Sequence, residues 1–168
     1  MSIFPPQILS LGKDVIAAAR EKRIRIVTAE SCTGGLLAAC LTEIPGASAV
    51  VDRGFVTYSD TSKMAQLSVD RKTIADFGAV SAETALEMAE GALLASHAEI
   101  AVAITGVSGP GGGTADKPVG LVFIALASAK NRDDQPLLKN NFPGDRGAIR
   151  LASVEAALRA LLKEIAKY

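Results

Sequence analysis

The chain has 168 residues, the usual length of one domain, and 49% of them are hydrophobic, so it can bury a core without disulfides or a structural metal. Its 18 basic and 18 acidic residues cancel to a formal net charge of zero, and aromatic residues make up 4% of the composition. These counts exclude the basic surface and the stacking aromatic side chains on which nucleic-acid binding depends.

Hydrophobic residues at helical spacing alternate along the chain with short apolar or β-branched runs. The pattern predicts, in chain order, a helix over 6–22, a strand over 24–29, a helix over 36–44, a strand over 54–58, a short helix near Lys63, a helix over 82–96 capped by Ser81, a strand over 100–105, a glycine-rich loop over 106–114, strands over 119–127 and 137–142, and a helix after Arg146. We therefore expect one α/β domain over residues 1–168, a three-layer α/β/α sandwich with a mixed, partly parallel sheet.

The cysteines and the N-terminal residues indicate the compartment. Cys32 and Cys40 are predicted on one helix, about 12 Å apart along its axis, which is too far for a disulfide. Two cysteines and one histidine do not make a standard zinc site. The first residues lack the pattern of a signal peptide, and no apolar stretch reaches the length that spans a bilayer. We expect a cytoplasmic protein without membrane contact.

The turn after the first predicted strand is the strongest candidate for chemistry. Ser31 falls where the first N–H groups of the following helix are unpaired, and Gly34 and Gly35 let a ligand approach the backbone. Such N–H groups at a positive helix end can stabilise an oxyanion. The same residue types equally allow Ser31 or Thr33 to be a simple helix cap.

A serine nucleophile needs a base. His97 lies at the end of a predicted helix, where we expect a helix-end or packing role. Lys63 can replace a histidine if burial lowers its pKa, and Tyr58 could relay a proton or orient the amine. Cys32 is the alternative nucleophile, because a helix N-terminus favours a thiolate.

The glycine-rich loop over 106–114 matches neither the P-loop pattern nor G-x-G-x-x-G. It is weak evidence for anion binding, although its place after a buried strand is typical of ligand sites in α/β proteins. Arg146 could add a forked contact to a phosphate, or it could be a solvated surface residue.

Five segments form one recognisable set. They are TAESCTGGLLAA at 28–39, GFVTYSDTSK at 54–63, GAVS at 78–81, AITGVSGPGGGTADKPVG at 103–120 and FPGDR at 142–146. Together they resemble the C-terminal domain of the competence/damage-inducible CinA family in its stand-alone form, over about residues 8–165. Members of that family are nicotinamide-nucleotide amidohydrolases, which convert nicotinamide mononucleotide to the acid nucleotide and ammonia in pyridine-nucleotide salvage.

The resemblance implies Ser31 as nucleophile, with Lys63 and Tyr58 completing its activation, and it implies neither a metal nor another cofactor. We expect the N–H groups of Thr33, Gly34 and Gly35 to hold the oxyanion. The expected contacts to a small nucleotide substrate are Thr105, Gly106, Gly109, Gly111 and Arg146. Alanine-rich helix faces suggest a homo-oligomer. A nucleotide-sensing module without catalysis and a purely structural partner protein remain the alternatives.

Overall fold

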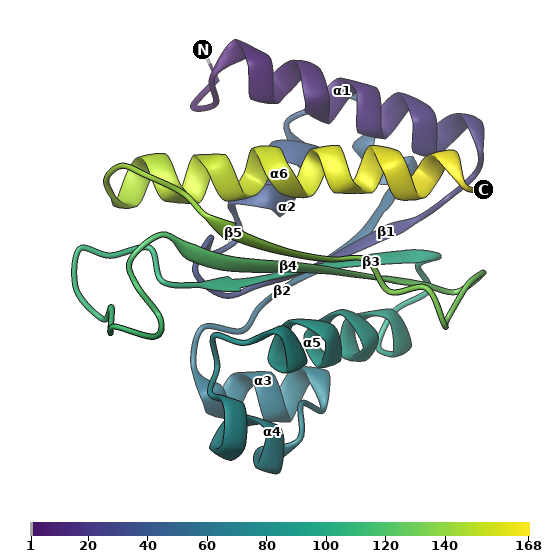
Figure 1. Cartoon of the computed structure of the whole chain (residues 1–168). Coiled ribbons are helices and arrows are strands. Elements are labelled where there is room, and N and C mark those ends of the chain that lie inside the picture. Colours follow the sequence, from purple (N-terminus) through teal and green to yellow (C-terminus); the bar gives the residue numbers. More distant parts are fainter. Residues whose placement is uncertain (1) are drawn as a thin grey trace.

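A computed structural model describes residues 2–168, which form a five-stranded sheet with helices on both faces (Figure 1). The elements are, in chain order, α1 (Pro6–Glu21), β1 (Ile26–Glu30), α2 (Leu36–Thr42), the 3₁₀ turn η1 (Ala47–Ala49), β2 (Val51–Val56), α3 (Asp60–Leu67), α4 (Arg71–Phe77), α5 (Ala82–Leu94), β3 (Ile100–Gly106), β4 (Leu121–Ser128), β5 (Leu137–Asn141) and α6 (Arg146–Ala166). Within residues 2–168, none of these helices is long and apolar enough to cross a bilayer.

The strand order is β2-β1-β3-β4-β5. β1 runs parallel to β2 and β3, whereas β4 is antiparallel to β3 and β5 is antiparallel to β4. The predicted mixed, partly parallel sheet and its late hairpin are therefore confirmed. Glu30 on β1 is level with Val56 on β2 and Ile104 on β3, so the carboxyl ends of the three parallel strands form one edge.

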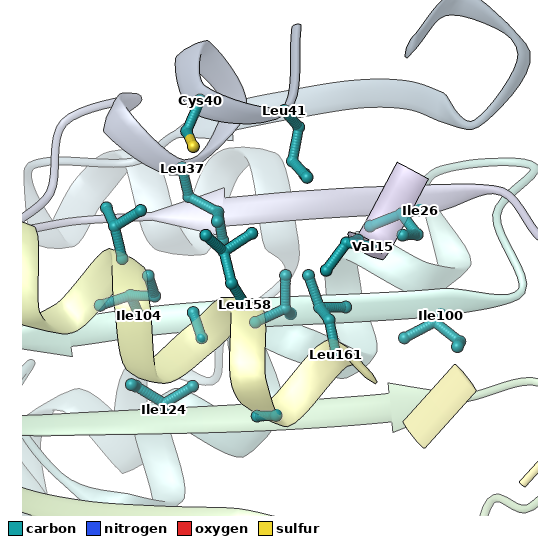
Figure 2. Close-up of a cluster of buried hydrophobic side chains, with 14 of the residues drawn as sticks. Val15, Ile26, Leu37, Cys40, Leu41, Ile100, Ile104, Ile124, Leu158 and Leu161 are labelled. Carbon is teal, nitrogen blue, oxygen red and sulfur yellow. The ribbon is translucent and has the colours of Figure 1, made fainter. Parts of the chain in front are cut away.

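Helices cover the two faces of the sheet in different ways. On one face α2 and α6 pack against large strand residues, among them Ile26, Ile104 and Ile124, with α1 lying over these two helices (Figures 1 and 2). On the other face α5 packs against strand alanines such as Ala101 and Ala103, with α3 and α4 beyond it. Small side chains let α5 approach the sheet closely. Helices on both faces of the sheet confirm the three-layer α/β/α arrangement.

The structure corrects the bounds of one strand, adds one helix and moves Cys32 out of a helix. β2 runs over Val51–Val56, whereas the sequence predicts 54–58. The sequence misplaces this edge strand because its residues are exposed or half-exposed and show no clear alternation. α4 was not predicted, since it is seven residues long and none of them is buried. Cys32 lies in the turn before α2 and does not share a helix with Cys40, because α2 begins at Leu36.

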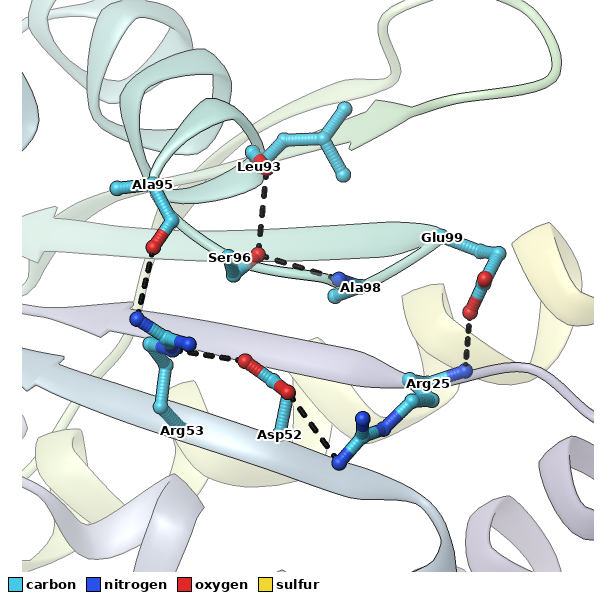
Figure 3. Close-up of polar contacts among 8 residues, drawn as sticks. All are labelled: Arg25, Asp52, Arg53, Leu93, Ala95, Ser96, Ala98 and Glu99. Carbon is cyan, nitrogen blue, oxygen red and sulfur yellow. Dashed lines mark hydrogen bonds and ion pairs between the residues drawn. The ribbon is translucent and has the colours of Figure 1, made fainter.

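Polar contacts hold the amino-terminal edge of the parallel strands (Figure 3). Asp52 pairs with Arg25 at 3.2 Å and with Arg53 at 2.7 Å, and Arg53 also donates to the Ala95 carbonyl oxygen at 2.9 Å. His97 is exposed at this edge, between α5 and the start of β3. The length of β3, roughly 20 Å, separates it from the carboxyl edge, so His97 cannot act as a base for Ser31.

Candidate active site

Ser31 lies at the carboxyl edge of the parallel strands, directly after β1. The chain leaves β1 for β2 on one side and later returns to β3 on the other. In open α/β sheets ligands bind at such a point, outside the carboxyl ends of the strands. The Ser31 N–H donates to the carbonyl oxygen of Ile104 at 2.9 Å, and the residue is 8% exposed. The sheet itself therefore holds the serine in place.

Lys63 brings an amine to the Ser31 hydroxyl from a separate helix. Reciprocal hydrogen bonds between Ser59 and Ser62, both 3.1 Å long, fix the first turn of α3. The Lys63 side chain points inward from this helix and is 1% exposed. Its Nζ atom lies 3.1 Å from Ser31 Oγ. The fold therefore joins the two residues that the sequence singled out as nucleophile and base.

The surroundings of the Lys63 amine favour its neutral form. Burial lowers the pKa of Lys63 below its ordinary value, against smaller opposing effects of Asp60 and Cys32. Nζ also contacts the carbonyl oxygens of Thr57 at 2.9 Å and Tyr58 at 3.4 Å. A neutral amine has two N–H groups and one lone pair. These two carbonyls can accept both N–H groups and leave the lone pair for Ser31, which is what a general base requires.

The thiol of Cys32 is a poor competitor for the nucleophilic role. Its side chain is buried, and burial raises the pKa of the thiol, outweighing the smaller lowering effect of the nearby Ser108 side chain. A protonated thiol attacks weakly, because the thiolate is the reactive form. Burial likewise raises the pKa of Cys40 to about 11, and both cysteines are free.

The Glu30 carboxylate anchors the turn that carries Ser31. Glu30 is completely buried at the end of β1. It accepts hydrogen bonds from the Thr33 hydroxyl and from the N–H groups of Gly35, Leu37 and Ala38, at 2.7, 3.1, 3.0 and 2.9 Å. A negative group at a helix N-terminus satisfies unpaired donors and complements the helix dipole. One side chain therefore links β1, the turn and the first turn of α2.

Two glycines and an arginine complete this turn. Gly34 and Gly35 have φ angles of 60° and 92°, in the left-handed region that favours glycine. Arg150 on α6 donates from Nη2 to the Thr33 carbonyl oxygen at 2.8 Å. The Gly34 N–H already donates to the Ser31 carbonyl oxygen at 3.0 Å, as the Gly35 N–H does to Glu30. That the N–H groups of Gly34 and Gly35 stabilise an oxyanion remains a prediction.

Arg146 connects three parts of the chain near the site. From the first residue of α6 it donates to the Gly109 carbonyl oxygen at 2.7 Å and to the Tyr58 hydroxyl at 2.9 Å. Tyr58 is 59% exposed, and its hydroxyl contacts Arg146 rather than Lys63. A hollow of about 560 Å³ opens between the glycine-rich loop and the start of α6, with Arg146 in its lining.

The remaining predicted contact residues lie on β3 and the loop that connects it to β4. The buried Thr105 donates its hydroxyl to the Ala79 carbonyl oxygen at 2.7 Å. A side chain at Gly106 would come within 2.7 Å of the Leu121 carbonyl oxygen, whereas Gly111 has open space around it. Within residues 2–168, no cluster of histidine, cysteine or acidic side chains is placed to hold a metal ion.

Sequence reasoning missed two residues that shape the site. Glu30 belongs to the turn that was singled out but received no role, although an acidic residue just before a helix is a recognisable signal. Arg150 gave no signal, because its target is a carbonyl oxygen that is 117 positions away in the chain. Both act on the backbone of the turn, which no side-chain motif describes.

Fold and site together define an α/β protein with a buried serine–lysine pair at the carboxyl edge of its sheet. The profile described as the CinA C-terminal domain matches residues 9–165. The chain belongs to this family. It is 42% identical over 158 residues to nicotinamide-nucleotide amidohydrolase PncC of Escherichia coli K12, covering 94% of each chain.

Other relatives agree in fold but differ in length. The crystal structure of competence/damage inducible protein CihA from Agrobacterium tumefaciens is 48% identical, with a TM-score of 0.94 and coverage of 97% of this chain and 98% of that one. A putative competence-damage inducible protein of Caldicellulosiruptor bescii is 46% identical over 158 residues. The aligned residues cover 94% of this chain but 38% of that protein, so the chain spans well under half the length of such longer relatives.

Proposed function

We propose that the chain hydrolyses the carboxamide of nicotinamide mononucleotide to nicotinate mononucleotide and ammonia, with Ser31 as nucleophile and Lys63 as base. The observation that carries the proposal is the buried 3.1 Å contact between Ser31 Oγ and Lys63 Nζ. The substrate comes from the names of relatives that the chain matches over nearly their whole length, such as the Escherichia coli protein.

The first step is attack by Ser31 on the carboxamide carbon. The neutral Lys63 amine takes the hydroxyl proton as the Oγ–C bond forms, and the carbonyl electron pair moves onto oxygen. The direct contact gives this proton a path that does not need the Tyr58 hydroxyl. Collapse of the tetrahedral species breaks the C–N bond, and the Lys63 ammonium returns its proton to the departing ammonia.

The second step releases the acid nucleotide. Lys63, neutral again, takes a proton from water as the water oxygen attacks the acyl carbon. The Ser31–acyl bond then breaks, and the proton returns to Ser31 Oγ. The sum is one water consumed for one carboxamide hydrolysed, with the side chains restored and no metal used.

Substrate binding uses the hollow beside α6. A phosphate there can replace the Gly109 carbonyl oxygen as a partner of the Arg146 guanidinium, whose planar donors suit phosphate oxygens. The open space around Gly111 lets the backbone approach the nucleotide, whereas Gly106 and Gly109 pack closely against Leu121 and Val119. The Tyr58 hydroxyl then serves to orient Arg146.

Ammonia release from nicotinamide mononucleotide by the purified chain tests this proposal. We expect turnover that survives a strong chelator and a fall in kcat of roughly 10³-fold or more in Ser31→Ala, as for other serine nucleophiles. Ser153→Ala is the matched control, because this serine is also buried but bonds to the Ile149 carbonyl oxygen within α6. Full activity in Ser31→Ala with none in Cys32→Ala would make Cys32 the nucleophile. Nucleotide binding without ammonia release would favour a sensing module.

A further inference from the structure

The N–H groups of the Ser31 turn divide into an occupied set and a free set. From residue 34 to residue 38 every backbone N–H has an acceptor inside the protein. The acceptors are the Ser31 carbonyl oxygen for Gly34, Glu30 for Gly35, Leu37 and Ala38, and the Thr33 carbonyl oxygen for Leu36. Within residues 2–168, the N–H groups of Cys32 and Thr33 have no acceptor from another residue, and that of Cys32 contacts only its own thiol.

We infer that Glu30 is a positioning residue for catalysis, which anchors the turn so that the free N–H groups of Cys32 and Thr33 receive the oxyanion. This inference rests on the proposed function and changes the expected donors from residues 33–35 to residues 32 and 33. The two free donors directly follow the nucleophile, where an oxyanion formed on the attacked carbon must lie. The N-terminus of α2 cannot serve instead, because Glu30 already occupies it.

The hydrogen bonds that Glu30 accepts require a carboxylate at this position. Oε2 accepts from the Thr33 hydroxyl and from the Gly35 and Leu37 N–H groups, while Oε1 accepts from Ala38. A carboxylate only accepts hydrogen bonds, whereas a glutamine amide has one acceptor atom and two N–H donors. In Glu30→Gln, an amide group must face a backbone N–H, so the turn loses at least one bond without a change in side-chain size.

Thr33 is the residue through which Glu30 acts. Its hydroxyl bonds to Glu30 at 2.7 Å, and its carbonyl oxygen accepts from Arg150 at 2.8 Å. The two contacts hold this residue from β1 and from α6. Its free N–H is therefore fixed in direction before substrate binds, which is the condition for efficient oxyanion stabilisation.

The test compares kcat and KM for ammonia release in the full chain. Glu30→Gln should lower kcat by roughly 10²-fold, the size of losing one oxyanion donor, with KM within threefold of wild type. Thr33→Val should lower kcat in the same way, and Thr33→Ser, which keeps the hydroxyl, should restore it. Glu164→Gln is the control, because Glu164 is 2% exposed near the far end of α6. It should change the melting temperature but not kcat.

A purely structural role for Glu30 predicts a different result. In that case kcat per folded molecule stays within twofold of wild type in Glu30→Gln, and Glu30→Gln and Glu164→Gln alter only the melting temperature. That outcome would overturn the inference.

Labelling with phenylmethylsulfonyl fluoride separates this inference from the choice of substrate. Ser31 Oγ bonds to sulfur, fluoride leaves, and Lys63 takes the proton, while the sulfonyl oxygens occupy the oxyanion position. Slower labelling of Ser31 in Glu30→Gln, seen by mass spectrometry, supports the inference even if nicotinamide mononucleotide is not hydrolysed. Equal turnover in wild type and Glu30→Gln keeps the proposed function and rejects the inference. No labelling and no turnover in wild type overturns both.

Discussion

A methyl group added at Gly91 should disable the site from a distance. Gly91 on α5 packs directly against the end of α3, and a Cβ atom there would lie 1.8 Å from the Leu67 carbonyl oxygen and 2.7 Å from the Leu67 carbonyl carbon. An ordinary C···O contact is about 3.3 Å, so in Gly91→Ala the two helices must separate by about 1.5 Å. Lys63 lies one turn before Leu67 on the same short helix and moves with it.

The loss of activity follows from the geometry of the pair. The contact from Lys63 to Ser31 is 3.1 Å, and a shift of this size takes it beyond hydrogen-bond range. A misplacement of about 1 Å can lower kcat by roughly 10²-fold. Overpacking should also lower the free energy of unfolding by about 1–3 kcal/mol, partly offset by about 1 kcal/mol from removing a glycine inside a helix.

The assay pairs ammonia release with urea unfolding, measured on Gly91→Ala and on Gly12→Ala. Gly12 also lies inside a helix, but a Cβ atom there would meet Cys40 Sγ at 3.4 Å, an ordinary contact. Gly12→Ala should keep wild-type kcat and gain up to about 1 kcal/mol in stability. If Gly91→Ala is folded and turns over at the wild-type rate, the position of α3 does not control the base, and the reasoning fails.

Three further predictions concern the base, the binding hollow and the core. Because burial lowers the pKa of Lys63, kcat/KM should rise with pH to a midpoint below the ordinary lysine value of 10.5. Between the lowered pKa and 10.5 the unfolded chain binds more protons at Lys63 than the folded chain, so the free energy of unfolding should rise with pH there. Urea unfolding of Lys63→Met at several pH values should lack this rise. Tyr58→Phe removes a partner of Arg146 and should raise KM for the nucleotide by roughly 5–10-fold with little change in kcat, whereas a loss confined to kcat would place Tyr58 in proton transfer. Leu158→Ala, at a fully buried position, should lower the free energy of unfolding by about 2–5 kcal/mol without changing kcat per folded molecule.

Elements with strong periodicity could be predicted from the sequence. The long amphipathic helix from Arg146 and the continuous apolar strand at 100–105 can be predicted because burial of one face, or of both, leaves a clear pattern. Ser81 was recognised as the cap of α5 from its residue type, and its side chain does accept from the Thr84 N–H. The edge strand β2 and the exposed helix α4 lack such a pattern, because neither has a face that is clearly buried.

The site could be predicted only in part. Ser31 and Lys63 were each identified from local chemistry and family resemblance, but their contact depends on how α3 returns to the edge of the sheet. The direction of backbone N–H groups depends on turn conformation, so the engagement of Gly34 and Gly35 with neighbouring acceptors could not be read from residue types. For the same reason Glu30 was placed within the turn without a role.

Arg146 and Arg150 lie on α6, which the ribosome makes after every other element of the fold. A ribosome completes Ser31 and Lys63 more than 80 codons before residue 150, and the last of the three parallel strands more than 40 codons before it, which is roughly a few seconds of translation or more. Until α6 docks, the Thr33 carbonyl oxygen lacks its partner and Tyr58 is not held by Arg146. A nascent chain of this kind therefore carries Ser31 and Lys63, the proposed nucleophile and base, but gains the contacts of Arg146 and Arg150 only when α6 has been made.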